Sequence, residues 1–412
     1  MHESDLSTDK KTVFNGFVGR VPIFTHALEL YGYDLRVSQN PTEQKKEVVL
    51  ENLSEESVIN ASQGVKLEAL VGNSPGFISV SDSFISRIDD LTWPREQVVL
   101  TLHNAAVSDD KKVSEVRELA EDGYTVAIEG GSQSLDVLRQ LDFASICAVD
   151  ADMLYSGIKD HVPEMHGAGF RMLAKNIETP DQYLMFKELG FDYFQGEYFE
   201  RPKLIGGTVI PANRIAVIDL LARLQDPDVK IEEIEDIVSQ DITLSYKLLR
   251  LINAAYFGMP QRVESVKRAT VFFGLERIKN WASVILFNAI DYKPRELLVT
   301  ALVRARTCEI LAQHLGLENP GSYYVAGMFS TLDAIMDAPM PSILERLQLV
   351  DDIRVALLEG SGPIGEMLTS ILAVESGIYY ESTRKFLDNG VAMHAYTNAI
   401  GWASEINQAI AA

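Results

Sequence analysis

Cysteine, basic residues and long hydrophobic runs are all scarce in this sequence. The two cysteines, Cys147 and Cys308, lie far apart and form no CxxC spacing, so zinc ribbons, iron–sulfur clusters and disulfide scaffolds are excluded. The longest apolar stretch covers residues 281–290, about half of the roughly 20 residues that a membrane-spanning helix needs. The acidic N-terminus lacks the basic and apolar segments of a secretory signal. We therefore expect a cytoplasmic protein without membrane insertion.

The shortage of positive charge bears on the class of partner. The chain has 37 Lys and Arg against 59 Asp and Glu, a net charge of -22. Because such a field repels a phosphate backbone, we expect no nucleic-acid partner. Apolar residues are abundant: 47% of the chain is hydrophobic and 23% charged, as in folded globular proteins. The length of 412 residues predicts two or three domains.

The first half of the chain alternates short β-rich runs with helix-like segments. This alternation predicts parallel strands in βα units, and so many units suggest a TIM-like (β/α) barrel. A stretch with Pro and Gly, residues 202–211, interrupts the rhythm, so we expect a barrel domain at 1–205. The expected strand runs after the opening pair are Val48 to Leu50, Gly76 to Val80, Val98 to Leu102, Tyr124 to Ile128, Ile146 to Val149, Arg171 to Ala174 and Tyr193 to Phe194.

The second half, residues 206–412, has apolar residues at helical spacing. Leu297 to Leu315 predicts a long helix that ends at Gly316, and residues 361–380 predict another. Glycine at 258 and 274 falls where helices end. The sequence therefore predicts α/β plus all-α architecture, a barrel followed by an all-helical domain.

Local patterns in residues 13–202 resemble those of EAL domains, barrel enzymes that hydrolyse the second messenger cyclic di-GMP. The run from Gly19 to Phe24, followed by Leu30 to Leu35, is similar to the opening strand pair of the family, which carries its Glu-Ala-Leu signature. Residues 177–180 and 186–202 are similar to its closing motif in order and spacing. The resemblance implies a barrel and a site in which acidic and amide side chains hold two divalent cations.

The family's metal-ligand and catalytic positions can be followed through this sequence. Several carboxylates are replaced by Ser, Thr or Lys, and Ser38 and Asn104 stand where an arginine and a glutamate are expected. We expect too little negative charge to hold two metal ions, no cofactor, and no hydrolysis. The positions that match the family site are Asp34, Ser79, Thr101, Glu129, Ala148, Asp150, Lys175, Glu178 and Gln195.

Two alternatives stay open for the carboxylates that remain. They are solvated or hydrogen-bonded residues at the barrel mouth, or they keep part of a ligand site. Lys175 has its own alternative, an ion pair with Glu129 or Asp150 that takes the place of the metal ions.

Residues 241–258 and 266–280 resemble the characteristic segments of HDOD domains, helical signalling modules related to metal-dependent HD phosphohydrolases. The motif positions are Asn253, Tyr256, Phe257 and Gly274. Ser330 and Thr331 stand in place of the metal-binding His-Asp pair, so we expect no metal here. Asn253 and the two aromatics form either a recognition surface or a helix end that packs on Phe272 or Phe273.

The combined resemblance is to EAL–HDOD two-domain signalling proteins. It predicts a bacterial signal-transduction protein without catalytic residues, an inactive scaffold that acts through protein contacts. The alternatives are a sensor that binds cyclic di-GMP or another nucleotide without cutting it, and an active cyclic di-GMP phosphodiesterase. We expect protein partners in signalling, their identity unknown, and the question of a homodimer stays open.

Overall fold

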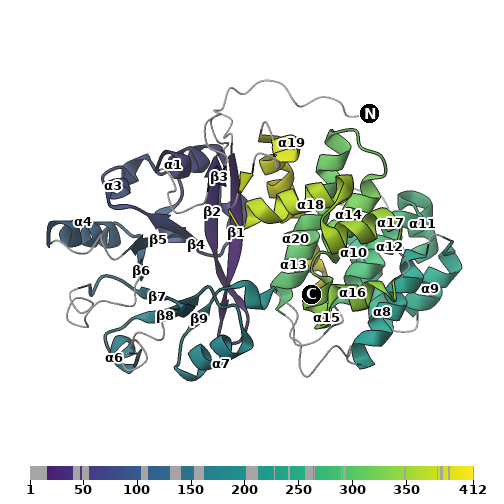
Figure 1. Ribbon diagram of the computed structural model, residues 1–412, viewed down its shortest axis with the longest axis horizontal. Coiled ribbons are helices and arrows are strands. Elements are labelled where there is room, and N and C mark those ends of the chain that lie inside the picture. The colour runs from purple at the N-terminus through teal and green to yellow at the C-terminus, as the bar shows by residue number, and fades with distance from the viewer. Residues whose placement is uncertain are drawn as a thin grey trace.

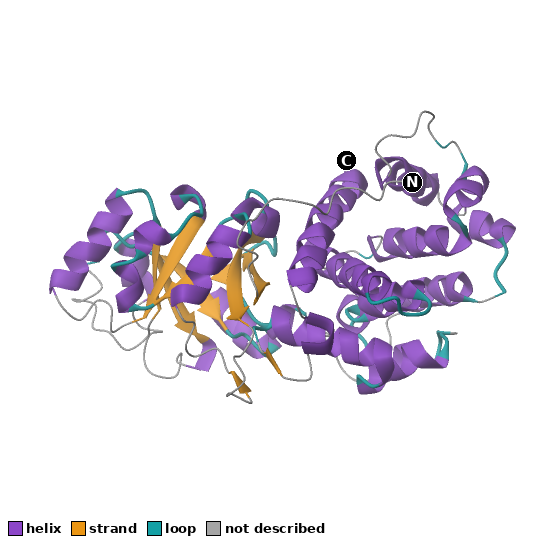
Figure 2. Ribbon diagram, turned by 90° about the horizontal axis from the view of Figure 1, so that it is seen from above, coloured by secondary structure: helices purple, strands orange, loops and turns teal. Residues whose placement is uncertain are grey.

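The computed structural model describes residues 16–39, 47–48, 55–103, 110–129, 141–152, 162–200, 212–226, 228–239, 242–255, 263, 265–288, 290, 294–347, 349–377, 379–380, 384–387 and 390–411. The barrel and the helical region lie side by side, and the first strands stand between them (Figure 1). One end of the molecule holds the barrel strands with helices around them, and the other end is built of helices (Figure 2).

Eight strands close into one barrel in the order β1-β2-β4-β5-β6-β7-β8-β9. The strand β1 runs antiparallel to both of its neighbours, whereas all pairs from β2 to β9 are parallel. Their bounds are β1 Gly16–Thr25, β2 Leu30–Gln39, β4 Gly76–Val80, β5 Val98–His103, β6 Thr125–Glu129, β7 Ile146–Asp150, β8 Arg171–Lys175 and β9 Tyr193–Phe194.

Alternate residues of these strands point into the barrel. The interior holds a small apolar cluster that is separate from the main core: Ile23, Phe77, Val99, Ala127, Ile146, Ala148 and Leu173. The next inward-facing side chains toward the carboxyl ends of the strands are mostly polar. The barrel is therefore filled with apolar side chains in its middle and carries polar groups at its carboxyl-terminal mouth.

Helices cover the outside of the barrel. The start of α7 is set by a capping box: the Thr179 side chain accepts a hydrogen bond from the Gln182 amide, and the Gln182 side chain accepts one from the Thr179 amide. Pro180 is the first residue of the helix. The helices of this part are α1 Glu55–Gly64, α2 Leu67–Val71, α3 Asp82–Ile85, α4 Asp110–Glu121, α6 Val162–Gly167 and α7 Pro180–Glu188.

The helical region packs around the long helix α13, Arg295–His314, whose buried side chains run along most of its length. The others are α8 Ala212–Gln225, α9 Ile231–Ser239, α10 Ile242–Ala255, α11 Val266–Phe273, α12 Leu275–Asn288, α14 Pro320–Phe329, α15 Leu332–Met336, α16 Met340–Leu344, α17 Asp351–Glu359, α18 Gly362–Glu375, α19 Arg384–Leu387 and α20 Val391–Ala411.

The two regions share one apolar core. The backbone of β1 lies so close to α18 that a Cβ on Gly19 would stand 2.5 Å from the carbonyl oxygens of Val374 and Glu375. The amide of Val18 also lies 3.2 Å from the Met393 sulfur on α20. Beside this contact, β3 (Glu47–Val48) pairs with β10 (Tyr379–Tyr380) from the opposite end of the chain.

The fold expected from the sequence is confirmed as a barrel followed by a mostly helical region. Two elements differ. The run 48–50 was expected to be a barrel strand, but β3 pairs outside the barrel; residues 361–380 form α18 followed by β10. The boundary expected between 205 and 206 stays a prediction, since residues 201–211 lie outside the described part. Among the described residues, no helix combines the length and apolarity needed to cross a membrane.

Candidate functional site

The barrel mouth gathers most of the positions that the sequence singled out. The register aligns Ser79 with Thr101, Glu129 with Ala148, and Asp150 with Lys175 on neighbouring strands. Since the carboxyl ends of parallel strands meet at one edge, these residues surround a common space. The loops 104–109, 130–140 and 153–161, which follow β5, β6 and β7, lie outside the described residues, and Asn104 with them.

Asp34 is buried and fully engaged by neighbouring groups. Its Oδ2 lies 2.8 Å from an Arg36 guanidinium nitrogen and accepts a hydrogen bond of 2.9 Å from the Gln195 amide. Burial opposes its ionisation, but the charges of Arg36 and Lys175 and the bond from Gln195 lower the pKa of Asp34 below its ordinary value. Asp34 is therefore a carboxylate in the folded protein.

A second ion pair crosses the mouth. The Lys175 ammonium lies 2.7 Å from Glu129 Oε1, and Lys175 is only 7% exposed. Of the two partners considered from the sequence, Glu129 is therefore the one that Lys175 meets. Asp150 instead accepts hydrogen bonds from the Asn176 side chain, at 2.5 Å, and from the Asp152 amide, at 3.0 Å.

Three of the other matched positions are uncharged residues: Thr101, Ala148 and Ser79. Thr101 is buried and Ala148 belongs to the apolar cluster inside the barrel. Ser79 is half-buried. Glu178 is exposed and lies just before the cap of α7, where its backbone amide donates to the Gln182 side chain. The side chain at Ser38 is outside the described part.

Two divalent cations, which the resemblance implies, do not fit the described side chains. Glu129 already forms an ion pair with the Lys175 ammonium, and Asp34 forms one with the Arg36 guanidinium. No group of three His, Cys, Asp or Glu side chains within the described residues is placed to hold a metal ion. Among the described residues of the mouth one acceptor is open, since Gln195 Oε1 is buried and has no hydrogen-bond partner there. A donor group on a ligand would satisfy it.

The HDOD motif residues that the structure describes have structural contacts. The Asn253 side chain donates to the carbonyls of Leu249 and Val263 and accepts from the Val263 amide at 2.8 Å. Asn253 therefore fixes the chain after α10. Gly274 ends α11 at φ +82°, a conformation that suits glycine. Tyr256 and Phe257 lie outside the described residues.

The two residues that stand in place of the His-Asp pair also make local hydrogen bonds. The Ser330 hydroxyl donates to the Gly327 carbonyl at 2.7 Å, and Thr331 is buried and donates to the Met328 carbonyl at 3.5 Å. Both hydroxyls thus cap the end of α14.

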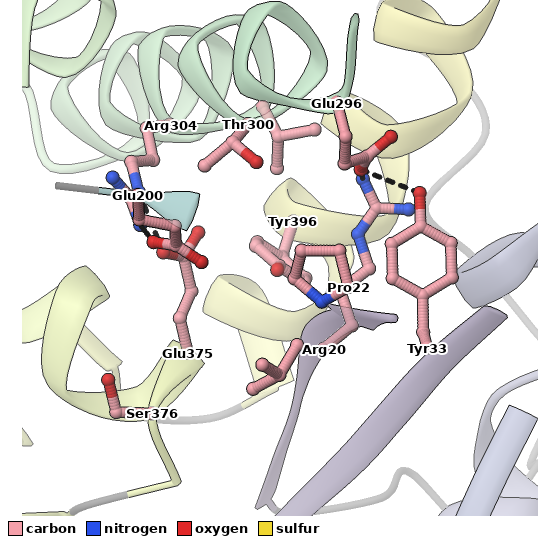
Figure 3. A pocket seen from close by; sticks show the side chains of 12 residues that line it. Arg20, Pro22, Tyr33, Glu200, Glu296, Thr300, Arg304, Glu375, Ser376 and Tyr396 are labelled. Carbon is pink, nitrogen blue, oxygen red and sulfur yellow. Dashed lines mark hydrogen bonds and ion pairs between the residues drawn. The ribbon is translucent and has the colours of Figure 1, made fainter. Parts of the chain in front are cut away.

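A buried charged cluster joins the barrel to the helical region, and the sequence interpretation missed it. Arg304 of α13 lies 2.7 Å from Glu375 of α18 and 3.1 Å from Glu200, just beyond the barrel. Tyr33 of β2 donates a hydrogen bond of 2.7 Å to Glu296. Figure 3 shows these side chains around one cavity of about 40 Å³, which has room for a few water molecules.

A second cation completes this cluster. Arg20 of β1 stands 4.4 Å from the ring centre of Tyr33 and 3.7 Å from Glu296. Burial raises the pKa of Glu296 and of Glu375, although the arginines oppose that shift. Burial alone would lower the pKa of Arg304, but Glu375 and Glu200 raise it. Three carboxylates thus share two guanidinium groups in a place with little water.

The chain is similar to several known proteins. Residues 210–348 match the HDOD domain family. Cyclic di-GMP phosphodiesterase CdgJ of Vibrio cholerae is 26% identical over 97% of this chain and 95% of its own length. The uncharacterized protein YuxH of Bacillus subtilis is 25% identical over 95% of this chain and 99% of its own. The manganese and cyclic di-GMP complex of Klebsiella pneumoniae BlrP1 is 14% identical, with a TM-score of 0.38, over 47% of this chain and 57% of its own.

One expectation from the sequence is wrong. We expected a catalytically inactive scaffold and no enzyme, but a relative similar over almost the whole chain is named a cyclic di-GMP phosphodiesterase. Although several ligand positions of the family are replaced, the fold still gathers polar groups at the barrel mouth, among them Asp34, Glu129 and Gln195.

The HDOD match covers the segment that follows the barrel, and the barrel itself closes as the EAL resemblance implies. The chain is an eight-stranded barrel followed by an HDOD domain, and its resemblance to EAL–HDOD signalling proteins is confirmed.

Proposed function

We propose that this chain hydrolyses cyclic di-GMP at the mouth of its barrel. The observation that carries the proposal is the similarity, over 97% of the chain, to a protein named a cyclic di-GMP phosphodiesterase. The reaction adds water across one P–O ester bond of the cyclic dinucleotide and leaves a linear dinucleotide with a terminal phosphate. A cytoplasmic location, protein partners and a homodimer remain proposals beside it.

The chain's own residues suit the binding of a phosphodiester. Arg36 and Lys175 bring two positive charges to the mouth, and each is held by a carboxylate, Asp34 or Glu129. Phosphate oxygens accept charge-assisted hydrogen bonds from such cations. Gln195 Oε1 lacks a donor, and an N–H of a guanine base would supply one. In this proposal Arg36, Lys175 and Gln195 bind and orient the substrate, and Asp34 and Glu129 hold the two cations in place.

The test is a product assay with the full-length protein. Purified protein is incubated with cyclic di-GMP in Mg²⁺ or Mn²⁺, and the linear dinucleotide is measured by chromatography. We expect product, and a loss of about tenfold or more in kcat/KM for Gln195→Leu and Lys175→Met. Asp90→Asn, an exposed carboxylate paired with Arg87, is the control and keeps the parent rate. Product formation no faster than without protein, in both metals, would overturn the proposal.

A further inference from the structure

A cavity of about 390 Å³ lies in the helical region. It shares no lining residue with the barrel mouth or with the interdomain cluster, the buried charged cluster of Arg304, Glu375 and Glu296. Its walls come from α12, α13, α14, α20 and the end of α11. Ligand cavities in proteins are typically about 300–1,000 Å³ and lie between helices in bundles. Ser330 and Thr331, which follow the C-terminal end of α14, do not line it. It is therefore separate from the position of the HD metal pair.

Aromatic side chains form much of this cavity. Trp281 and Tyr324 are almost fully buried, at 5% and 4% exposure. Phe273 packs edge-on against Trp281, with ring centres 5.3 Å apart, and Tyr324 packs edge-on against Trp402 at 6.4 Å. Flat apolar walls of this kind stack well on a planar ring.

Three of the residues that line the cavity hold buried polar atoms without a partner. Asn280 Oδ1, Arg306 Nε and Tyr324 Oη are buried without a hydrogen-bond partner. Within the described residues only two other buried side-chain atoms share this condition, and both belong to the barrel mouth, on Arg36 and Gln195. Because an unpaired buried polar atom is destabilising, a small movement of these side chains toward a ligand in the cavity, which supplies the partners, is favourable.

The lining charges constrain the kind of ligand. Glu276 and Glu309 balance Arg277 and Arg306, and Arg306 already lies 2.5 Å from Glu309. The cavity therefore has no formal excess of either sign, and recognition rests on the flat walls and on hydrogen bonds. Asn280 Oδ1 needs a donor, Arg306 Nε needs an acceptor, and the Tyr324 hydroxyl can take either role.

We propose that this cavity binds a purine base, as a free nucleoside or as part of a nucleotide. A purine is planar and carries N–H donors beside ring or carbonyl acceptors, which matches the aromatic walls and the amide and guanidinium atoms. The proposal is independent of cyclic di-GMP hydrolysis, since the cavity shares no residue with the barrel mouth. In the bound form the base satisfies Asn280 and Arg306.

Tryptophan fluorescence offers a direct test. The chain has three tryptophans, and two of them, Trp281 and Trp402, line the cavity. In a Trp93→Phe background the signal therefore comes from the cavity alone. Guanosine, adenosine, GMP, AMP and UMP are titrated, with N-acetyltryptophanamide as the correction for absorbed light. We expect saturable quenching by purines with a Kd on the order of 10–100 µM, and none by UMP.

Tighter binding of GMP or AMP than of the nucleosides would identify nucleotides as the source of the base, and equal binding would identify the base alone. Both support the proposal. Tyr324→Phe and Asn280→Leu remove one hydrogen-bonding group each, and we expect about tenfold weaker binding. Tyr323→Phe is the matched control, because Tyr323 is equally buried but does not line the cavity. Circular dichroism verifies that each variant is folded.

Two results would overturn the proposal. One is the absence of saturable quenching by every purine. The other is equal purine affinity in the folded parent, Tyr324→Phe and Asn280→Leu proteins. Equal binding of UMP and GMP would also contradict it, because the proposed selectivity for a purine would then be missing.

Discussion

The hydroxyl of Tyr33, on the second barrel strand, donates a hydrogen bond of 2.7 Å to Glu296 at the start of α13, 263 residues later in the chain. Both residues are buried. A hydrogen bond to a charged acceptor is worth about 1.5–3 kcal/mol, and more is lost when the acceptor stays buried without it. This bond links the barrel to the helical domain directly.

Tyr33→Phe removes that hydroxyl and keeps the ring. We expect the free energy of unfolding, measured in urea, to fall by about 1.5–3 kcal/mol. Tyr246→Phe is the matched control, because Tyr246 is 62% exposed, and we expect no change there. An unchanged unfolding midpoint in Tyr33→Phe would show that the bond does not stabilise the fold.

Arg304→Met leaves two carboxylates, Glu375 and Glu200, without their shared cation. Breaking a buried ion pair by removing one partner typically costs about 3–5 kcal/mol, because the remaining charge stays in a place with little water. We expect a loss of that size in urea unfolding. Arg87→Met, which removes an exposed pair with Asp90, should cost less than about 1 kcal/mol. Equal losses in the two variants would contradict this account.

The buried glutamates give the protein a defined pH dependence. Burial raises the pKa of Glu375 and Glu296 above the ordinary value of 4.5. The folded chain therefore keeps these protons at a pH where the unfolded chain has released them, so their stabilising effect is full below about pH 4.5 and is lost as the pH rises through the folded pKa values.

Glu375→Gln tests this sign, because glutamine cannot ionise. We expect the variant's loss of stability relative to the parent to shrink as the pH rises from about 4.5, measured by urea unfolding at several pH values. Glu359→Gln, at an exposed position, is the matched control for the loss of a carboxylate. A Glu375→Gln penalty that grows with pH would mean that the carboxylate form is favoured in the fold.

Gly19 is the point of closest approach between the barrel and α18. A Cβ there would stand 2.5 Å from two carbonyl oxygens, so Gly19→Ala must push α18 away from β1. We expect a loss of about 1–3 kcal/mol, as in other overpacked contacts. Gly401→Ala, in α20 with open space around it, should instead stabilise by about 0.5–1 kcal/mol. A neutral Gly19→Ala would show that the contact adjusts freely.

The sequence predicted the parts of this protein that depend on local pattern. The alternating strands near 98–102 and 146–149 formed as expected, and the long helix after Pro294 is shifted by only two residues at its start. The ion pair of Lys175 was one of two alternatives. The strand register places Lys175 beside Asp150, and only the side-chain geometry shows that Lys175 pairs with Glu129.

The interdomain cluster could not be predicted in the same way. Its members are separated by up to hundreds of residues, and each charged residue taken alone resembles a surface residue. Arg304 offers one signal in the sequence, because it interrupts an otherwise apolar helical run. The structure buries this residue in α13. The cavity of the helical region depends on the packing of five helices, which no single segment encodes.

The contact between β1 and the last helices has a consequence for synthesis on the ribosome. The first barrel strand packs on residues such as Met393 and Val374, which are made last. A growing chain therefore carries the apolar outer face of β1 uncovered until almost the whole protein has emerged. A release of the nascent chain before residue 362, where α18 begins, would leave that face exposed, so such fragments should aggregate or bind chaperones.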